Sequence, residues 1–110
     1  MPALQWSDEL YWLARTHSYN MSIQVVPFGH AGFNQRAGAC PFSKQSFAEN
    51  VAYCNNYERN EIPKIIVDGW IESPGHRKNM LSRQNCCGIA AFKGANGNWY
   101  FTQLFAFRNF

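Results

Sequence analysis

Three histidines carry the most versatile chemistry in this sequence of 110 residues, and they are His17, His30 and His76. A neutral imidazole ligates zinc and similar divalent metals, and near neutral pH it also takes up and releases protons. The three lie far apart in the sequence, and no H-x-x-x-H pair places two of them on one helix face. Spacing alone therefore does not predict a metal site, which would require the fold to bring the histidines together.

The first two histidines lie in segments of different character. His17 belongs to the apolar stripe of a helix expected over residues 7–22, which starts with a hydroxyl cap and two acidic residues. We expect His17 to be buried, either as a satisfied core residue or as part of a lined cavity. Residues 23–26 are expected to form a short strand or a loop. His30 lies in a glycine- and alanine-rich segment, residues 28–39, which is expected to be an irregular connection.

His76 lies at a sharp break in the chain. Residues 63–73 are expected to form a helix that begins with a proline, since proline fits the first helical position. Pro74 disfavours helical backbone at the residue before it, and Gly75 lets the chain turn. A second short helix is expected over residues 76–81. This corner could aim the His76 side chain into a cleft, although it is also an ordinary position for a helix start.

The carboxylate of Glu49 follows the His30 segment. Residues 46–56 are expected to form a short helix capped by Ser46, because apolar side chains recur along it at helical spacing. In its first turn, Glu49 would stabilise the helix dipole whatever else it does. The apolar side of this helix would consist of Phe47, Val51 and Cys54.

Two apolar runs, residues 86–93 and 98–107, flank the turn signal Gly94-Ala95-Asn96-Gly97 and predict a β-hairpin. Both faces of the second run are largely apolar, so this strand is expected to be covered on both sides. Helices above and below the sheet would provide that cover. The sequence therefore predicts an α+β fold in which helices pack against an antiparallel sheet.

Length and composition describe one globular domain over residues 1–110. Hydrophobic residues make up 46% of the chain, which suits a single core. The formal charge of +3 is small and the ten Lys and Arg residues are scattered, so a nucleic-acid surface is not expected. No apolar stretch reaches membrane-spanning length. We expect a monomer without a nucleic-acid partner.

Four cysteines point to an oxidising compartment, and none forms a C-x-x-C pair typical of structural zinc sites. A disulfide between Cys40 and Cys54 would close a loop of thirteen residues and staple it to the helix at 46–56. The alternative links Cys54 to Cys86 or Cys87, which point to opposite faces if they lie in a strand. The first six residues show no signal peptide, so we expect a mature secreted domain from which the peptide has been removed, and a cytosolic protein is the alternative.

Several motifs occur in order along the chain and together cover nearly all of it. They are residues 14–21, residues 28–30 followed by Arg36, residues 48–53, the W-I-E-S-P-G-H-R-K-N-M-L stretch at 70–81, and residues 87–90 with 98–105. This set resembles the CAP superfamily, the cysteine-rich secretory, antigen 5 and pathogenesis-related proteins. It is most similar to the bacterial-type SCP-like branch of that superfamily.

The resemblance implies a three-layer α-β-α sandwich with a central antiparallel sheet and a cavity lined by histidines and acidic residues. In some members this cavity binds a divalent metal. Matched motif by motif, the resemblance implies that His30, Glu49 and His76 form the cavity and could hold zinc or another divalent metal. The residues expected to line it are His17, Ser73 and Asn50.

The chain departs from the family pattern at two positions. Ala48 replaces the usual glycine before Glu49. Ser73 stands where the plant and animal branch has a second cavity glutamate, and the nearby Glu72 is one place off, about 100° round a helix. A full set of two histidines and two glutamates is therefore not implied here.

Known family members bind sterols and other lipids, act in host defence or associate with cell walls. The resemblance thus implies a secreted binding module for a lipid, sterol, cell-wall or host ligand. The alternative is a hydrolase of peptide or glycan, in which His30, Glu49 and His76 would be the catalytic groups. A structural or interaction domain is the third hypothesis.

A hydrolase of the covalent kind would need an activated nucleophile. Serines lie beside two of the histidines, Ser18 next to His17 and Ser73 near His76. The sequence holds no G-x-S-x-G elbow, and neighbours in sequence need not face each other. Nothing in the sequence therefore selects a nucleophile.

Overall fold

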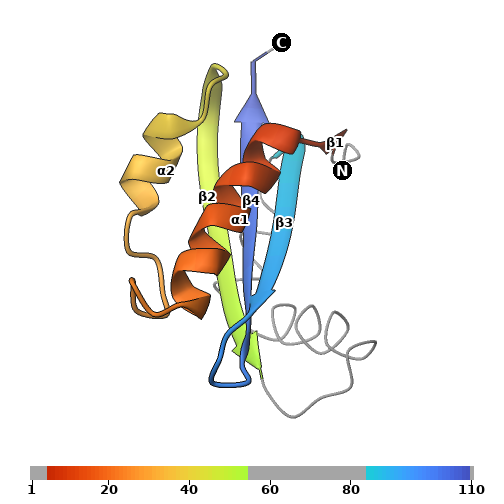
Figure 1. Cartoon of the computed structure of the whole chain (residues 1–110). Coiled ribbons are helices and arrows are strands. Elements are labelled where there is room, and N and C mark those ends of the chain that lie inside the picture. The colour runs from red at the N-terminus through yellow and green to blue at the C-terminus, as the bar shows by residue number, and fades with distance from the viewer. Residues whose placement is uncertain (1–4, 55–83, 110) are drawn as a thin grey trace.

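A long helix crosses one face of a four-stranded sheet in the computed structural model, which describes residues 5–54 and 84–109 (Figure 1). The elements in chain order are β1 (Gln5–Trp6), α1 (Asp8–Ser22), α2 (Phe33–Ala39), β2 (Lys44–Cys54), β3 (Cys86–Lys93) and β4 (Trp99–Arg108). The strand order in the sheet is β1-β3-β4-β2. β4 pairs antiparallel with both β2 and β3, whereas the two residues of β1 pair parallel to β3. The α+β class is confirmed, and the parallel pair is an addition to the antiparallel sheet that the sequence predicts.

Helix α1 follows the sequence signals closely. The Ser7 hydroxyl accepts a hydrogen bond from the backbone N–H of Leu10 at 3.2 Å, and Asp8 and Glu9 occupy the first turn. The buried side of the helix consists of Leu10, Ala14, His17, Ser18, Met21 and Ser22. After the helix, residues 23–26 form turns and bends and not a strand. The predicted apolar stripe, with His17 on it, is therefore confirmed.

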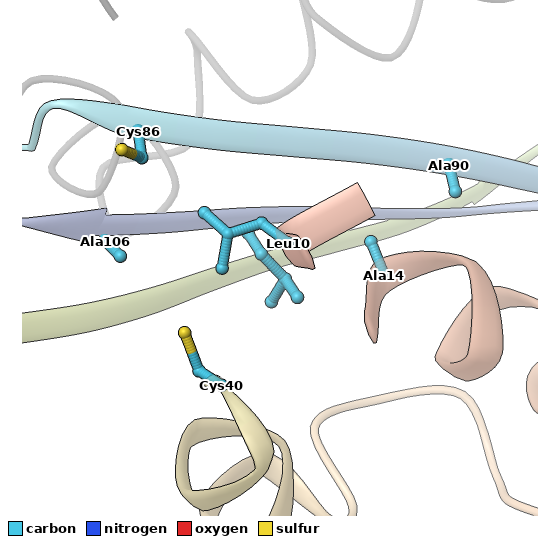
Figure 2. Packing of buried hydrophobic residues seen from close by; sticks show 7 residues of the cluster. Leu10, Ala14, Cys40, Cys86, Ala90 and Ala106 are labelled. Atoms are coloured by element: carbon cyan, nitrogen blue, oxygen red, sulfur yellow. The ribbon is translucent and has the colours of Figure 1, made fainter. Parts of the chain in front are cut away.

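Helix α1 packs so closely on the sheet that its backbone contacts the backbone of strand β3. Gly88 of β3 lies under the first turns of α1, and a Cβ atom at this position would collide with the backbone of Leu10 and Tyr11. Leu10 lies in the middle of the resulting apolar cluster (Figure 2). The buried members of this cluster are Leu10, Ala14, Cys40, Cys86, Ala90, Leu104 and Ala106.

Both faces of β4 are buried, as the sequence predicts. Leu104 and Ala106 face α1 and are fully buried. Phe101 and Phe105 alternate with them along the strand and are 7% and 1% exposed on the opposite face. Strand β4 is therefore covered on both faces. The helices expected over residues 63–73 and 76–81 lie outside the described residues.

The helix predicted over residues 46–56 is wrong, because the described part of this segment, residues 46–54, belongs to strand β2. Phe47 and Val51 are four residues apart, a spacing that places two side chains on one side of a helix and equally on one face of a strand. Pairing decides between the two, since β2 lies beside β4 from Lys44↔Arg108 to Cys54↔Trp99. The strand starts before Ser46, which is thus not a helix cap.

The irregular connection expected over residues 28–39 is wrong in its second half, which forms helix α2. Gly29 and Gly32 have φ angles of 144° and 82°, and they turn the chain before the helix begins. The seven residues that follow lack proline, and the one residue among them that strongly disfavours a helix, Gly38, lies next to its end. In Figure 1, α2 lies to the side of β2.

The expected disulfides are not formed, and all four cysteines are free thiols. Cys40 lies in the cluster under α1, whereas Cys54 lies on the opposite face of the sheet with Phe101. Because residue 54 belongs to a strand, the sheet separates these two thiols. The alternative link fails too, since Cys54 lies opposite Trp99, whereas Cys86 and Cys87 lie opposite Ala106 and Phe105, about 20 Å away along β4.

Cys86 and Cys87 point to opposite faces of β3, as expected for adjacent residues of a strand. Cys86 is buried in the cluster under α1, and Cys87 is only partly buried. Burial is the main cause that raises the pKa of both thiols. Neither thiol is therefore activated as a nucleophile in this environment.

Within residues 5–54 and 84–109, no helix is both long and apolar enough to cross a membrane.

Candidate functional site

Two helices, a loop and a strand bring a polar cluster together beside the sheet. His17 comes from α1, His30 from the loop before α2, Arg36 from α2, and Glu49 from β2. Glu49 lies opposite Leu104 in the sheet, and Leu104 packs under α1. The Glu49 side chain therefore projects to the same side of the sheet as both helices. We refer to His17, His30, Arg36 and Glu49 as the Arg36 cluster.

The centre of the cluster is a two-pronged ion pair between Arg36 and Glu49. Arg36 Nε donates to Glu49 Oε2 at 2.6 Å, and Arg36 Nη2 donates to Glu49 Oε1 at 2.7 Å. The Glu49 side chain is 1% exposed and that of Arg36 is 12% exposed. A buried carboxylate is costly unless a charge partner and hydrogen bonds compensate it, and the planar guanidinium supplies both.

The remaining N–H groups of Arg36 also have acceptors. Nη1 donates to the Ala31 carbonyl at 2.7 Å and to His17 Nδ1 at 3.1 Å, and Nη2 donates to the His30 carbonyl at 3.3 Å. With the two bonds to Glu49, all five N–H groups of the guanidinium are engaged. Arg36 thus fixes the loop, α1 and β2 relative to one another.

His17 is held as a neutral ring. Its Nε2 lies 2.7 Å from the carbonyl oxygen of Gly29, which can only accept, so Nε2 carries the hydrogen. Nδ1 is then free to accept from Arg36, which cannot lose its protons. Burial lowers the pKa of His17, and the Arg36 charge lowers it further, while the bond to Gly29 and the Glu49 charge act in the opposite direction. The hydrogen bonds and the electrostatics agree on the neutral form.

His30 is oriented by the same carboxylate. Its Nδ1 lies 2.9 Å from Glu49 Oε1, and because a carboxylate oxygen accepts, Nδ1 carries the hydrogen. The basic lone pair of a neutral ring is then on Nε2. The His30 side chain is 53% exposed, so a buried carboxylate aligns a histidine that solvent and ligands can reach.

Two grooves flank the ion pair. The first, of about 310 Å³, is lined by His30, Phe33, Phe47, Ala48 and Glu49. The second, of about 360 Å³, lies between the two helices. Its lining residues are Leu13, Thr16, His17, Asn20, Val26, Ala31, Gly32, Gln35, Arg36 and Ala39. Each groove therefore receives one histidine of the cluster, and we call them the His30 groove and the His17 groove.

The structure brings His17, His30 and Glu49 to one place. His76 and Ser73 lie outside the described residues, so their part in the site stays a prediction. Asn50 does not line the cluster as expected. It alternates with Glu49 along β2, is fully buried on the opposite face of the sheet, and donates to Gln103 Oε1 at 3.2 Å.

Arg36 is the residue to which sequence reasoning assigned no role. It appeared only as the arginine that follows His30 in the loop motif. The available signal was physical, since a carboxylate that is expected in a cavity needs a cation beside it. Arg36 stands out because the segment around it consists mainly of small and uncharged residues.

Ser18 is a structural residue and not a partner of His17. Its hydroxyl donates to the Ala90 carbonyl at 3.0 Å and shares a hydrogen bond of 2.7 Å with the Thr102 hydroxyl. It is fully buried between α1 and the sheet. Ser18 is therefore no candidate nucleophile.

The described residues do not fit a divalent cation. Both nitrogens of His17 are hydrogen-bonded, and both oxygens of Glu49 accept from a guanidinium. Within residues 5–54 and 84–109, no three His, Cys, Asp or Glu side chains are grouped so as to hold a metal. A zinc site of His30, Glu49 and His76 remains an untested prediction.

The fold and the site together define an α+β domain in which a central sheet, with four strands among the described residues, positions an Arg–Glu pair flanked by two histidines. The chain belongs to the CAP family, because the model of the cysteine-rich secretory protein family matches residues 1–105.

Solved structures share the fold. An outer surface protein from Borrelia burgdorferi superposes with a TM-score of 0.74 at 22% identity, over 99% of this chain and 80% of that one. An extracellular protein with an SCP domain from Bacillus anthracis gives a TM-score of 0.75 at 24% identity, over 99% of this chain and 35% of that one. No curated protein matches the sequence. The likenesses establish the fold, and the function has to be argued from the site.

Proposed function

We propose that this chain is a secreted CAP-domain binding module that holds an amphipathic lipid- or sterol-like ligand in the His30 groove. The observation that carries the proposal is the pairing, in one groove, of an aligned and accessible histidine with two aromatic rings. Family membership and the outer-surface and extracellular neighbours support secretion.

The His30 groove offers separate contacts for the two ends of such a ligand. The rings of Phe33 and Phe47 lie 5.5 Å apart at 52°, and together they present an apolar wall. His30 offers Nε2 as an acceptor for a ligand hydroxyl, while Glu49 holds the ring in position. Few polar groups in a mainly apolar groove are typical of small-molecule sites.

The polar side of the groove is preorganised. Glu49 is held by Arg36 before any ligand arrives, and Arg36 is in turn held by two backbone carbonyls. A ligand therefore does not have to order the histidine on binding, which lowers the entropic cost of association.

A titration with the fluorescent sterol dehydroergosterol and with a fluorescent fatty acid tests this proposal. We expect saturable binding of at least one probe, weakened at least fivefold in Phe33→Ala and in His30→Ala. Gln35→Ala is the matched control, because Gln35 lies on the same helix as Phe33 but lines the His17 groove. Circular dichroism checks that each variant is folded. Equal binding by all variants, or none by the wild type, contradicts the proposal and turns the search to cell-wall or protein ligands.

A hydrolase is the second candidate, and the His30–Glu49 contact is the observation that favours it. A carboxylate that accepts from Nδ1 and leaves Nε2 basic is the arrangement of a general base that activates water. Peptide and glycan substrates with a chromogenic leaving group test it. Turnover should disappear in His30→Gln. Turnover that survives His30→Gln would exclude this site.

A further inference from the structure

In the Arg36 cluster, the groups of Glu49 and His17 that ligate metals in other proteins are all hydrogen-bonded, whereas His30 keeps its Nε2 open to the groove. Arg36 contacts both oxygens of Glu49 and Nδ1 of His17. His30 donates to the same carboxylate and gives its backbone carbonyl to Arg36. The guanidinium thus takes the contacts that a cation shared by the His17 imidazole and the Glu49 carboxylate would take.

The protonation states point to the same conclusion. An arginine side chain is always charged in proteins. The Glu49 carboxylate that pairs with Arg36 belongs to a side chain that is only 1% exposed. His17 has no lone pair left for a metal, because one nitrogen donates to Gly29 and the other accepts from Arg36. A divalent ion beside Glu49 would displace these bonds and would lie next to a buried positive charge.

We propose that Arg36 is a built-in cation that replaces a divalent metal in this site, and that it keeps zinc away from His17 and Glu49. The proposal goes beyond ligand binding, since it concerns the charge at the centre of the cluster and applies whether or not the His30 groove is filled. Removing the guanidinium should leave a latent site with an imidazole and a carboxylate facing one space.

The experiment is a zinc titration by calorimetry of the wild type, Arg36→Ala, and Arg36→Ala combined with Glu49→Gln. We expect Arg36→Ala to gain at least tenfold in zinc affinity, and the double variant to lose that gain. Arg15→Ala is the matched control, because Arg15 is an arginine of α1 that stacks on Trp12 and Phe92, outside the cluster. Zinc held elsewhere, for example by thiols, binds all four proteins alike and is subtracted.

Methylguanidinium adds a competition arm. It should fit the space that Arg36→Ala leaves and lower the zinc affinity of that variant, while it leaves zinc binding by Arg15→Ala unchanged. A gain in affinity that methylguanidinium does not reduce would show that zinc binds outside the guanidinium position, and would overturn the proposal.

A measurement on the wild type keeps the proposal testable if Arg36→Ala fails to fold. The ¹⁵N spectrum of the arginine Nε–H groups should show an Arg36 signal that zinc neither shifts nor broadens. Zinc binding by the wild type that moves this signal and disappears in Glu49→Gln would overturn the proposal. So would an Arg36→Ala variant that folds and gains no zinc affinity.

Discussion

Two buried positions of helix α1, Leu10 and His17, are attached to the rest of the molecule in different ways. Near Leu10 the helix packs on β3 and β4 through apolar side chains and backbone contact at Gly88. Near His17 it is tied to the Gly29 loop and to α2 by hydrogen bonds to single atoms. Apolar packing depends on volume, whereas the Arg36 cluster depends on matched donors and acceptors. The two positions should therefore respond differently to the same kind of substitution.

Removing the guanidinium of Arg36 should cause the largest loss of stability. Arg36→Met removes the guanidinium beside the buried Glu49 carboxylate, which should lower the free energy of unfolding by about 4 kcal/mol. Urea unfolding measures it. Adding Glu49→Leu should restore part of the loss, because replacing both partners removes the stranded charge. A loss below about 1 kcal/mol in Arg36→Met would show that the cluster is not a structural centre.

Truncation of Leu10 should cause the second-largest loss of stability. Leu10 is fully buried in the middle of its cluster, so Leu10→Ala should cost about 3 kcal/mol through lost contacts and a residual cavity. Thermal and urea unfolding measure the change. If Leu10→Ala costs less than about 1 kcal/mol, the cluster has collapsed around the missing side chain and the packing is looser than described.

A pair of conservative substitutions tests the comparison most directly. Leu10→Met keeps volume and should cost less than about 1.5 kcal/mol. Arg36→Lys keeps charge but cannot reach both Glu49 oxygens and His17 at once, and should cost about 2 kcal/mol. If the lysine variant is as stable as the methionine variant, the charge of Arg36 matters and its hydrogen-bond geometry does not.

The pH dependence of stability should show the smallest effect. The pKa of His17 is lowered from its ordinary value of 6.5, chiefly by burial, so the native state favours the neutral ring. Below pH 6.5 the unfolded chain binds a proton that the native ring resists. The stabilisation is therefore complete above pH 6.5 and is lost as pH falls towards the native pKa.

The comparison of wild type with His17→Gln isolates this contribution. The difference between their unfolding free energies should shrink as pH falls from 7 to 5, because only the wild type carries the imidazole at position 17. A difference that grows with acidity would mean that the native state binds the proton more tightly than the unfolded chain, contrary to the geometry.

The parts of the fold that the sequence predicts are those specified by local signals. Helix α1 has its cap, its acids and its stripe within sixteen residues, and the β3–β4 hairpin has its turn signal between two apolar runs. β2 was mistaken for a helix because residues 46–56 carry a spacing that suits both structures. The strand that it pairs with, β4, lies about fifty residues further along the chain, and no local sequence feature indicates this pairing.

The candidate site follows the same division. Motif matching pointed to His17, His30 and Glu49, which the structure brings together. It gave no role to Arg36, because a guanidinium that bridges α1, a loop and β2 is defined only once these elements are in place. The prediction that Asn50 lines the cavity fails because residues 44–54 form a strand and not a helix. In a strand, the adjacent side chains of Glu49 and Asn50 point to opposite faces of the sheet.

The position of β4 in the sheet has a consequence for synthesis of the chain. β4 lies between β2 and β3 and follows both in the sequence. Among the described strands, β2 pairs only with β4. Until β4 emerges from the ribosome, Glu49 and Val51 therefore cannot take their places in the sheet. The sheet can close only when residues 99–108 have emerged, so this domain is expected to fold in one late step and not from its N-terminus onward.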